Sequence, residues 1–161
     1  MLEDCAKFAL LFQQIGWHKP ISLFEQYLKE QNAGKKNVLV IKHKNDLLGY
    51  VTIQWESEYP FFKQRHIPEI KDFNILPAYQ RQGFGSALLH YAEQLISQHS
   101  KRAGIGVGLT PDYGAAQILY IKSGYIPNGE GITQNLQTLV IGSKITVDDD
   151  TVLWLTKELY L

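Results

Sequence analysis

The sequence has little of several features that would point to particular classes of protein. It holds one cysteine, Cys5, so an intramolecular disulfide and a cysteine-based metal site are excluded and a reducing, cytoplasmic compartment is expected. Its 16 basic residues match 16 acidic ones, which removes any electrostatic argument for nucleic acid or a membrane surface as the main partner. No apolar run approaches the roughly 20 residues of a membrane span. The early acidic residues Glu3 and Asp4 do not fit a signal peptide. The five histidines show no ligand spacing, so no metal is expected.

Apolar periodicity predicts one α/β domain over residues 1–161. Helical three- and four-residue steps alternate with short runs of strand composition. The expected helices are 3–15, 20–32, 84–100 and 113–123, and the expected strands are 38–41, 47–55, 69–76, 104–109 and 152–159, with short strand pieces at 138–141 and 145–147. Residues 56–68 are interpreted as an aromatic binding loop or an ordinary connection, and 126–137 as a Gly-rich connection.

The most informative stretch runs from Leu76 to Leu89, where a strand passes through a glycine turn into a helix. The first N–H groups of a helix have no internal partner and carry partial positive charge, so this arrangement favours an anion such as phosphate. Gly83 and Gly85 let a phosphate approach the backbone, and Arg81 adds a charged donor. The Walker and dinucleotide patterns both fail here. A tight turn without a ligand explains the glycines equally well.

Two carboxylates in the strand 69–76 are costly to bury without partners. Glu69 stands at the start of this strand, where a solvent-filled cleft would reach it, and a salt-bridged surface carboxylate is the alternative. Asp72 projects to the opposite face if the strand is regular. In the strand 104–109, three glycines share one face, which invites close approach of a ligand or tight packing of another element.

Two motifs in this sequence resemble those of the GNAT superfamily of acyl-CoA-dependent N-acyltransferases. Gln80-Arg81-Gln82-Gly83-Phe84-Gly85 is similar to the family's Gln/Arg-x-x-Gly-x-Gly/Ala turn, and residues 118–125 resemble a second signature through Leu119, Tyr120, Gly124 and Tyr125. The resemblance covers residues 38–127 well. It implies a mixed, mostly antiparallel sheet with a central parallel strand pair that splays apart, and helices on both faces. It also implies a strand before the first helix, for which only Met1 and Leu2 are present.

The resemblance also assigns roles to particular residues. Glu69 matches a general base that acts directly or through water, and Tyr120 matches the general acid near the coenzyme sulfur. Without the resemblance, Tyr120 is equally a core aromatic with a bonded hydroxyl. The backbone at Phe73 and Ile75 matches the segment that holds the pantetheine arm. The residues matching the pyrophosphate-binding turn are Gln80, Arg81, Gln82, Gly83, Phe84, Gly85 and Ser86.

The function implied is transfer of an acetyl group from acetyl-CoA to a primary amine of a small molecule or peptide. A non-catalytic acyl-CoA sensor and a nucleotide-binding domain using the same turn are the alternatives. The first two helices, with Trp17 and His18 between them, are expected to help form the acceptor pocket. No residue pattern identifies the acceptor, and the sequence is compatible with a homodimer without indicating one.

Overall fold

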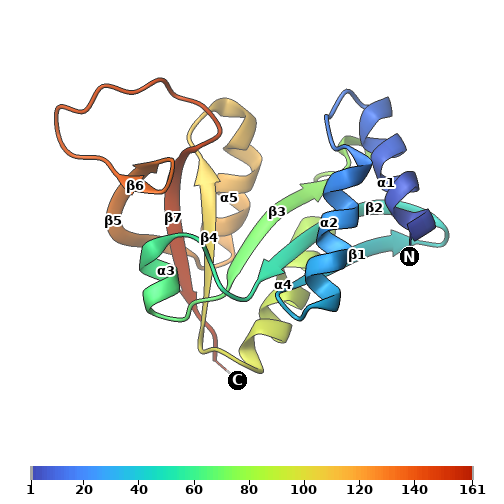
Figure 1. The fold of residues 1–161 in the computed structure, drawn as a ribbon, viewed down its shortest axis with the longest axis horizontal. Helices are drawn as coiled ribbons and strands as arrows, with labels where there is room; N and C mark the ends of the chain where they lie inside the picture. The colour runs from blue at the N-terminus through green and yellow to red at the C-terminus, as the bar shows by residue number, and fades with distance from the viewer. Residues whose placement is uncertain (1, 161) are drawn as a thin grey trace.

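The protein is built on a seven-stranded sheet with helices on both faces, seen in a computed structural model that describes residues 2–160 (Figure 1). The strands are β1 Lys36–His43, β2 Asp46–Gln54, β3 Glu69–Ile75, β4 Arg102–Gly108, β5 Ile126–Gln134, β6 Gln137–Thr138 and β7 Thr151–Glu158. The helices are α1 Leu2–Gln14, α2 Ile21–Asn32, α3 Pro60–Gln64, α4 Phe84–Ser97 and α5 Gly114–Lys122, with 3₁₀ turns at Pro77–Tyr79 and Pro111–Tyr113.

The sheet is mixed, with strand order β1-β2-β3-β4-β7-β5-β6. Every neighbouring pair is antiparallel except β3 and β4, which lie near the centre. The helix α4 makes the crossover that a parallel pair requires. This confirms the expected mostly antiparallel sheet with one central parallel pair.

The parallel strands stay together over only a short length. Their register pairs are Glu69 with Gly104 and Ile70 with Ile105, after which β3 and β4 separate. Figure 1 shows the two strands close at their lower ends and diverging upward. Within residues 2–160, the part of β3 beyond Ile70 therefore has no ladder partner on its β4 side. We call this opening the β3–β4 wedge.

Alternate residues of β2 pack on opposite faces of the sheet, one covered by α4 and the other by α1 and α2. Val51 and Ile53 join Leu88 and Leu89 of α4 in the larger core. Tyr50 faces the other way, where α1 and α2 pack against the sheet, and its ring lies 5.5 Å from the Phe12 ring, centroid to centroid. Burying each large apolar side chain stabilises the fold by about 1.5–3 kcal/mol, so these two faces hold both helical layers in place.

A β-bulge interrupts the pairing of β2 with β3. The register shifts between Tyr50, which pairs with Asn74, and Thr52, which pairs with Lys71. Asp72 in the bulge has a φ of 50°, a conformation unusual for a residue with a side chain. The strand is therefore not regular, and the expectation that Asp72 points away from the Glu69 face is wrong. Its carboxylate instead accepts a hydrogen bond from Tyr50, which lies on that face.

The C-terminal third contains the main secondary-structure errors of the sequence interpretation. The Gly-rich connection expected at 126–137 is mostly the strand β5, whose register shifts between Pro127 and Ile132 where it pairs with β7. Of the short strands expected at 138–141 and 145–147, only the end of β6 at Thr138 forms. Residues 56–68 contain the short helix α3. At the front, Leu2 begins α1, and Met1 lies outside the described residues.

The bare glycine face of β4 is covered by aromatic side chains. A Cβ added at Gly104 would lie 2.3 Å from the Phe62 ring, and one at Gly108 would lie 2.3 Å from the Tyr113 ring. A Cβ at Gly106 would meet Trp154 at 2.9 Å. Tight packing of neighbouring elements is therefore the reason for these glycines, and the larger side chains enter the space that they leave.

Candidate active site

The turn between β3 and α4 presents free backbone donors at the open end of the wedge. Gly83 is the N-cap of α4 with a φ of 85°, and no side chain caps the helix. The N–H groups of Phe84, Gly85 and Ser86 therefore keep the donor capacity of a helix N-terminus. Arg81, also at positive φ (59°), is exposed beside them. A turn with these features suits a phosphate group.

Two of the candidate turn residues use their side chains within the turn. The Gln80 amide donates to the carbonyl of Ile75 at 2.9 Å, and the Gln82 amide donates to the carbonyl of Ala78 at 3.0 Å. Both glutamines therefore shape the turn. The exposed donors of the turn include its backbone N–H groups and the side chains of Arg81 and Ser86.

Side chains from three elements converge behind the turn. A Cβ at Gly85 would lie 3.4 Å from Leu119 of α5 and 3.7 Å from both Phe73 and Ile75 of β3. The Phe73 and Tyr120 rings meet edge to face, with centroids 6.1 Å apart. The structure thus brings together the β3 residues, the start of α4 and the second motif, which are distant in the sequence.

Tyr120 is 4% exposed at the centre of this contact region. Burial is the main cause that raises the pKa of Tyr120, and Tyr113 raises it further. The Tyr120 hydroxyl therefore keeps its proton at neutral pH. Within residues 2–160 this hydroxyl has no hydrogen-bond partner. A buried hydroxyl that keeps its proton is a candidate proton donor.

Glu69 lies at the closed end of the wedge, next to Gly104, and is 3% exposed. Its Oε2 accepts a hydrogen bond of 2.6 Å from the Ser57 hydroxyl, which itself accepts from the Tyr59 N–H at 3.0 Å. Burial raises the pKa of Glu69, against the opposing effects of Lys71 and the Ser57 bond. A carboxylate with a raised pKa is better suited to take up a proton at neutral pH.

Asp72 is the centre of a polar cluster that the sequence interpretation missed. The Lys19 ammonium and the Tyr50 hydroxyl donate to its carboxylate, together with Tyr27 at 2.8 Å and Asn74 at 2.8 Å. Burial opposes the charged form, but Lys19 and the hydrogen bonds outweigh it and lower the pKa of Asp72. Burial and Asp72 raise the pKa of both tyrosines, which therefore remain donors.

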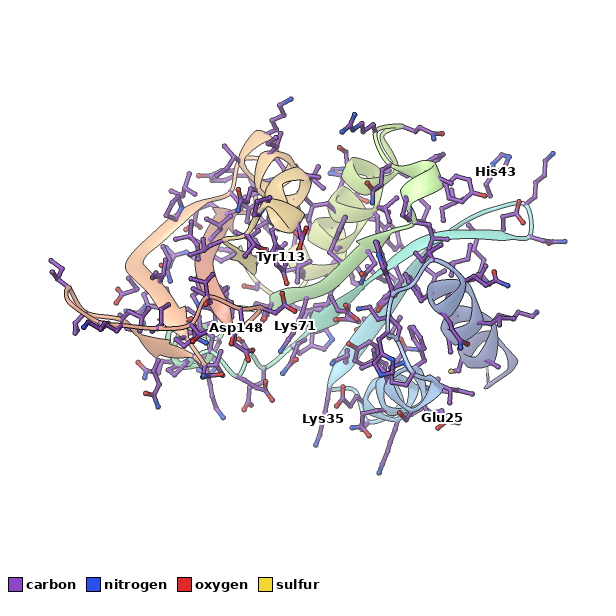
Figure 2. The ribbon with its side chains drawn as sticks, turned by 90° about the horizontal axis from the view of Figure 1, so that it is seen from above. Glu25, Lys35, His43, Lys71, Tyr113 and Asp148 are labelled. Carbon is purple, nitrogen blue, oxygen red and sulfur yellow. The ribbon has the colours of Figure 1, made fainter. Side chains whose placement is uncertain are left out.

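Lys19, which bonds to Asp72 in this cluster, belongs to the loop between α1 and α2. Of the two residues expected to line a pocket here, Trp17 stacks on Phe12 at 5.7 Å and His18 is exposed. Both line a surface pocket of ≈ 450 Å³, and Lys19 lines it too. Figure 2 shows α1 and α2 on the side of the sheet opposite α4 and α5, with Lys71 of β3 between the two layers. The signal available in the sequence was a charged residue inside an apolar strand, without any indication of its partner.

Neither a membrane span nor a metal centre is found among the described residues. No helix within residues 2–160 is long and apolar enough to cross a membrane. The same residues contain no group of three or more His, Cys, Asp or Glu side chains placed to hold a metal ion. The acidic segment 148–150 is exposed, and the Tyr113 hydroxyl donates a hydrogen bond to Asp149 in it at 2.9 Å.

Comparison with known proteins links this geometry to one family. Residues 34–127 match the family model of the acetyltransferase (GNAT) domain. No protein of curated function matches the chain. Among solved structures, similarity extends to a ribosomal-protein-alanine N-acetyltransferase from Brucella melitensis (16% identity, 99% of this chain and 96% of the other, TM-score 0.70). It extends also to yncA, a putative acetyltransferase from Salmonella typhimurium solved with its cofactor acetyl-CoA (14% identity, 100% of this chain and 91% of the other, TM-score 0.70). A third similar structure is that of an aminoglycoside 6'-acetyltransferase type Ii (15% identity, 84% of this chain and 77% of the other, TM-score 0.59). At these identities the structures show a shared fold, and the two acceptors that the names give, a ribosomal-protein alanine and an aminoglycoside, differ from each other.

Proposed function

Because this chain belongs to the GNAT acetyltransferase family, we propose that it transfers the acetyl group of acetyl-CoA to a primary amine. The family and the fold support acyl transfer from acetyl-CoA. The primary amine as acceptor, and the roles of individual residues, are the additional content of the proposal.

The observation that carries the proposal is the β3–β4 wedge with its two flanking features. An uncapped helix N-terminus lies on one side of it, and the hydroxyl of Tyr120 is buried near it without a partner. Backbone groups of β3 beyond Ile70 are not used by β4. A pyrophosphate fits the first feature, and an extended amide-containing arm fits the unpaired strand. These residues therefore fit coenzyme A.

The chemistry required is divided among three parts of the chain. Acetyl-CoA supplies a thioester, whose carbonyl carbon is the electrophile. Glu69 accepts the proton that the attacking ammonium must lose, directly or through water. A backbone N–H of the Phe73–Ile75 segment stabilises the negative charge that develops on the carbonyl oxygen. The amine nitrogen attacks the carbonyl carbon and forms the C–N bond, and Tyr120 donates its proton to the sulfur as the C–S bond breaks. The second proton that the nitrogen loses returns to the Tyr120 oxygen, and the proton on Glu69 passes to water, so the products are the amide and the free thiol.

The direct test is calorimetric titration with acetyl-CoA, with ATP and NAD as controls, followed by a free-thiol release assay against a panel of primary amines. We expect binding of acetyl-CoA alone and thiol release with at least one class of amine. Binding without release for any amine would favour the sensor alternative. Failure of folded protein to bind acetyl-CoA would overturn the proposal.

A matched pair of tyrosine variants tests the general acid. We expect Tyr120→Phe to lower kcat about 100-fold while the Kd for acetyl-CoA changes by less than about twofold, because only the proton donor is lost. Tyr125→Phe is the control, since it removes the hydroxyl of a second buried tyrosine in the same motif, one that lies next to Glu93. Equal turnover in the two variants would remove Tyr120 from the mechanism.

A further inference from the structure

Lys19 occupies a site built to hold an ammonium ion. Its Nζ donates to Asp72 and lies 5.7 Å from the centroid of the Tyr50 ring. Tyr27, Tyr50 and Asn74 donate to the same carboxylate and orient it. A fixed carboxylate beside an aromatic ring is the combination that recognises a cationic nitrogen. We call Asp72, Tyr27, Tyr50 and Asn74 the ammonium cage.

The cage differs from the surface ion pairs of the same protein. The side chains of Lys19 and Asp72 are 19% and 17% exposed, whereas those of Lys63 and Glu56 are 59% and 74% exposed. Asp72 also takes a φ of 50° in the bulge, which has an energetic cost for a residue with a Cβ. Desolvated charges and backbone strain concentrated at one position are typical of a functional site.

The position of the cage connects it to the reaction centre. Asp72 is adjacent in the chain to Phe73, so their Cα atoms are about 3.8 Å apart, and the Phe73 ring contacts Tyr120. The bulge lies beyond the last β3–β4 register pair, at the opening of the wedge. Lys19 belongs to the α1–α2 loop and lines the surface pocket beside it. A cation could therefore reach Asp72 from the helical side once Lys19 moves out.

We propose that the ammonium cage is a subsite for a second cationic group of the acceptor, and that Lys19 fills it when no acceptor is bound. This inference rests on the proposed function. A carboxylate that binds an ammonium favours its charged form, whereas the reacting amine must become neutral. The group held by Asp72 is thus distinct from the nucleophile, and the acceptor class is a diamine or a larger polyamine. Exchange of Lys19 for the acceptor's ammonium leaves the charge of the cage unchanged.

The cage itself is tested without acetyl-CoA. Lys19→Ala removes three carbons and the ammonium, so n-propylammonium chloride is the matching probe. We expect it to raise the Tm of Lys19→Ala by about 3–6 °C at tenfold above its Kd. The Tm of wild type should not change, because Lys19 already fills the cage. Neutral n-propanol, and tetramethylammonium, which has no N–H donor, should have no effect.

Two control variants separate the cage from general ionic effects. Lys71→Ala removes another β3 lysine, paired with Glu58 at 3.5 Å outside the cage, and should not respond to the probe. The double variant with Lys19→Ala and Asp72→Asn should also fail to respond. Folded Lys19→Ala protein that gains no stability from n-propylammonium, or gains as much from tetramethylammonium, would overturn the inference.

Turnover by wild-type protein gives an independent measurement should Lys19→Ala not fold. Across diamines of three to six carbons, the best KM should be at least about 10-fold below that of the monoamine of equal length. Equal KM values would overturn the diamine assignment while leaving acetyl transfer intact. Conversely, probe binding by Lys19→Ala without any thiol release would support the cage and count against the proposed function.

Discussion

Two carboxylates three residues apart on β3 have opposite electrostatic surroundings. Glu69 is held at the closed end of the wedge, where burial raises its pKa and a single side-chain hydroxyl, from Ser57, bonds to it. Asp72 lies in the bulge, where Lys19 and three further donors lower its pKa despite burial. The same strand therefore carries one carboxyl group suited to take up a proton and one suited to remain charged.

The difference arises from local backbone geometry. In the regular part of β3, Glu69 pairs with Gly104, and its side chain is covered by the segment before α3. The bulge turns Asp72 toward the α1 and α2 layer, where cationic and hydroxyl groups are available. Environments that separate two pKa values in this way are a common means of dividing base and binding roles.

The largest effect on activity is expected from Glu69→Gln. Loss of the proposed general base should lower kcat about 100- to 1000-fold with little change in the Kd for acetyl-CoA, measured by thiol release and calorimetry. Glu58→Gln, an exposed neighbour paired with Lys71, is the matched control and should retain activity. Activity of Glu69→Gln within about twofold of wild type would end the assignment of Glu69 as the base.

The same variant should be more stable than wild type at neutral pH. Because burial raises the folded-state pKa of Glu69 above its ordinary value near 4.5, the folded protein binds the proton more tightly than the unfolded chain. Stability is then lost as pH rises from the ordinary value through the raised pKa. Glutamine removes this loss, so thermal unfolding at pH 7 should show a higher Tm, which is the opposite direction to the loss of activity.

Asp72→Asn removes the carboxylate of the ammonium cage and is also expected to lower stability. It leaves Lys19 partly buried without its counter-ion, at a cost of about 1–3 kcal/mol after allowance for partial exposure. The folded pKa of Asp72 is lowered, so wild type keeps this stabilisation above the ordinary value near 3.8 and loses it as pH falls through the lowered pKa. Denaturation across pH 2–7 should show a flatter profile for Asp72→Asn. Asp46→Asn, at the exposed first residue of β2, should leave the profile unchanged.

The elements around the turn between β3 and α4 could be predicted because their signals are local. A strand composition, two glycines and a helical stripe lie within Leu76 to Leu89, and α4 begins at Phe84 as expected. The splaying of β3 from β4 followed from the family resemblance, and the register confirms it. The contacts of Phe73 with Tyr120 needed the fold, since the two residues are far apart in the chain.

The surroundings of Asp72 could not be predicted because their determinants are not local. The bulge at Asp72 depends on how β2 and β3 register, and the sequence pattern gives no measure of that register. Lys19 and Asp72 are 53 residues apart in the chain. The strand β5 was missed because Gly129 and Gly131, both at positive φ, interrupt its alternation where its pairing with β7 is irregular.

The smallest and most specific test of the comparison is Ser57→Ala. The Ser57 hydroxyl is the one side-chain donor to Glu69 among the described residues, and its bond favours the charged carboxylate. Without it the pKa of Glu69 should rise further, so the acidic limb of the pH–rate profile should move to higher pH, while the plateau kcat stays within about twofold. Ser57→Thr retains a hydroxyl and should restore the wild-type profile. Neither change should alter the pKa of Asp72 in the ammonium cage, because the Ser57 hydroxyl donates to Glu69. A profile that does not move in Ser57→Ala would mean that the limb reports a group other than Glu69, and the division of roles between the two carboxylates would then fail.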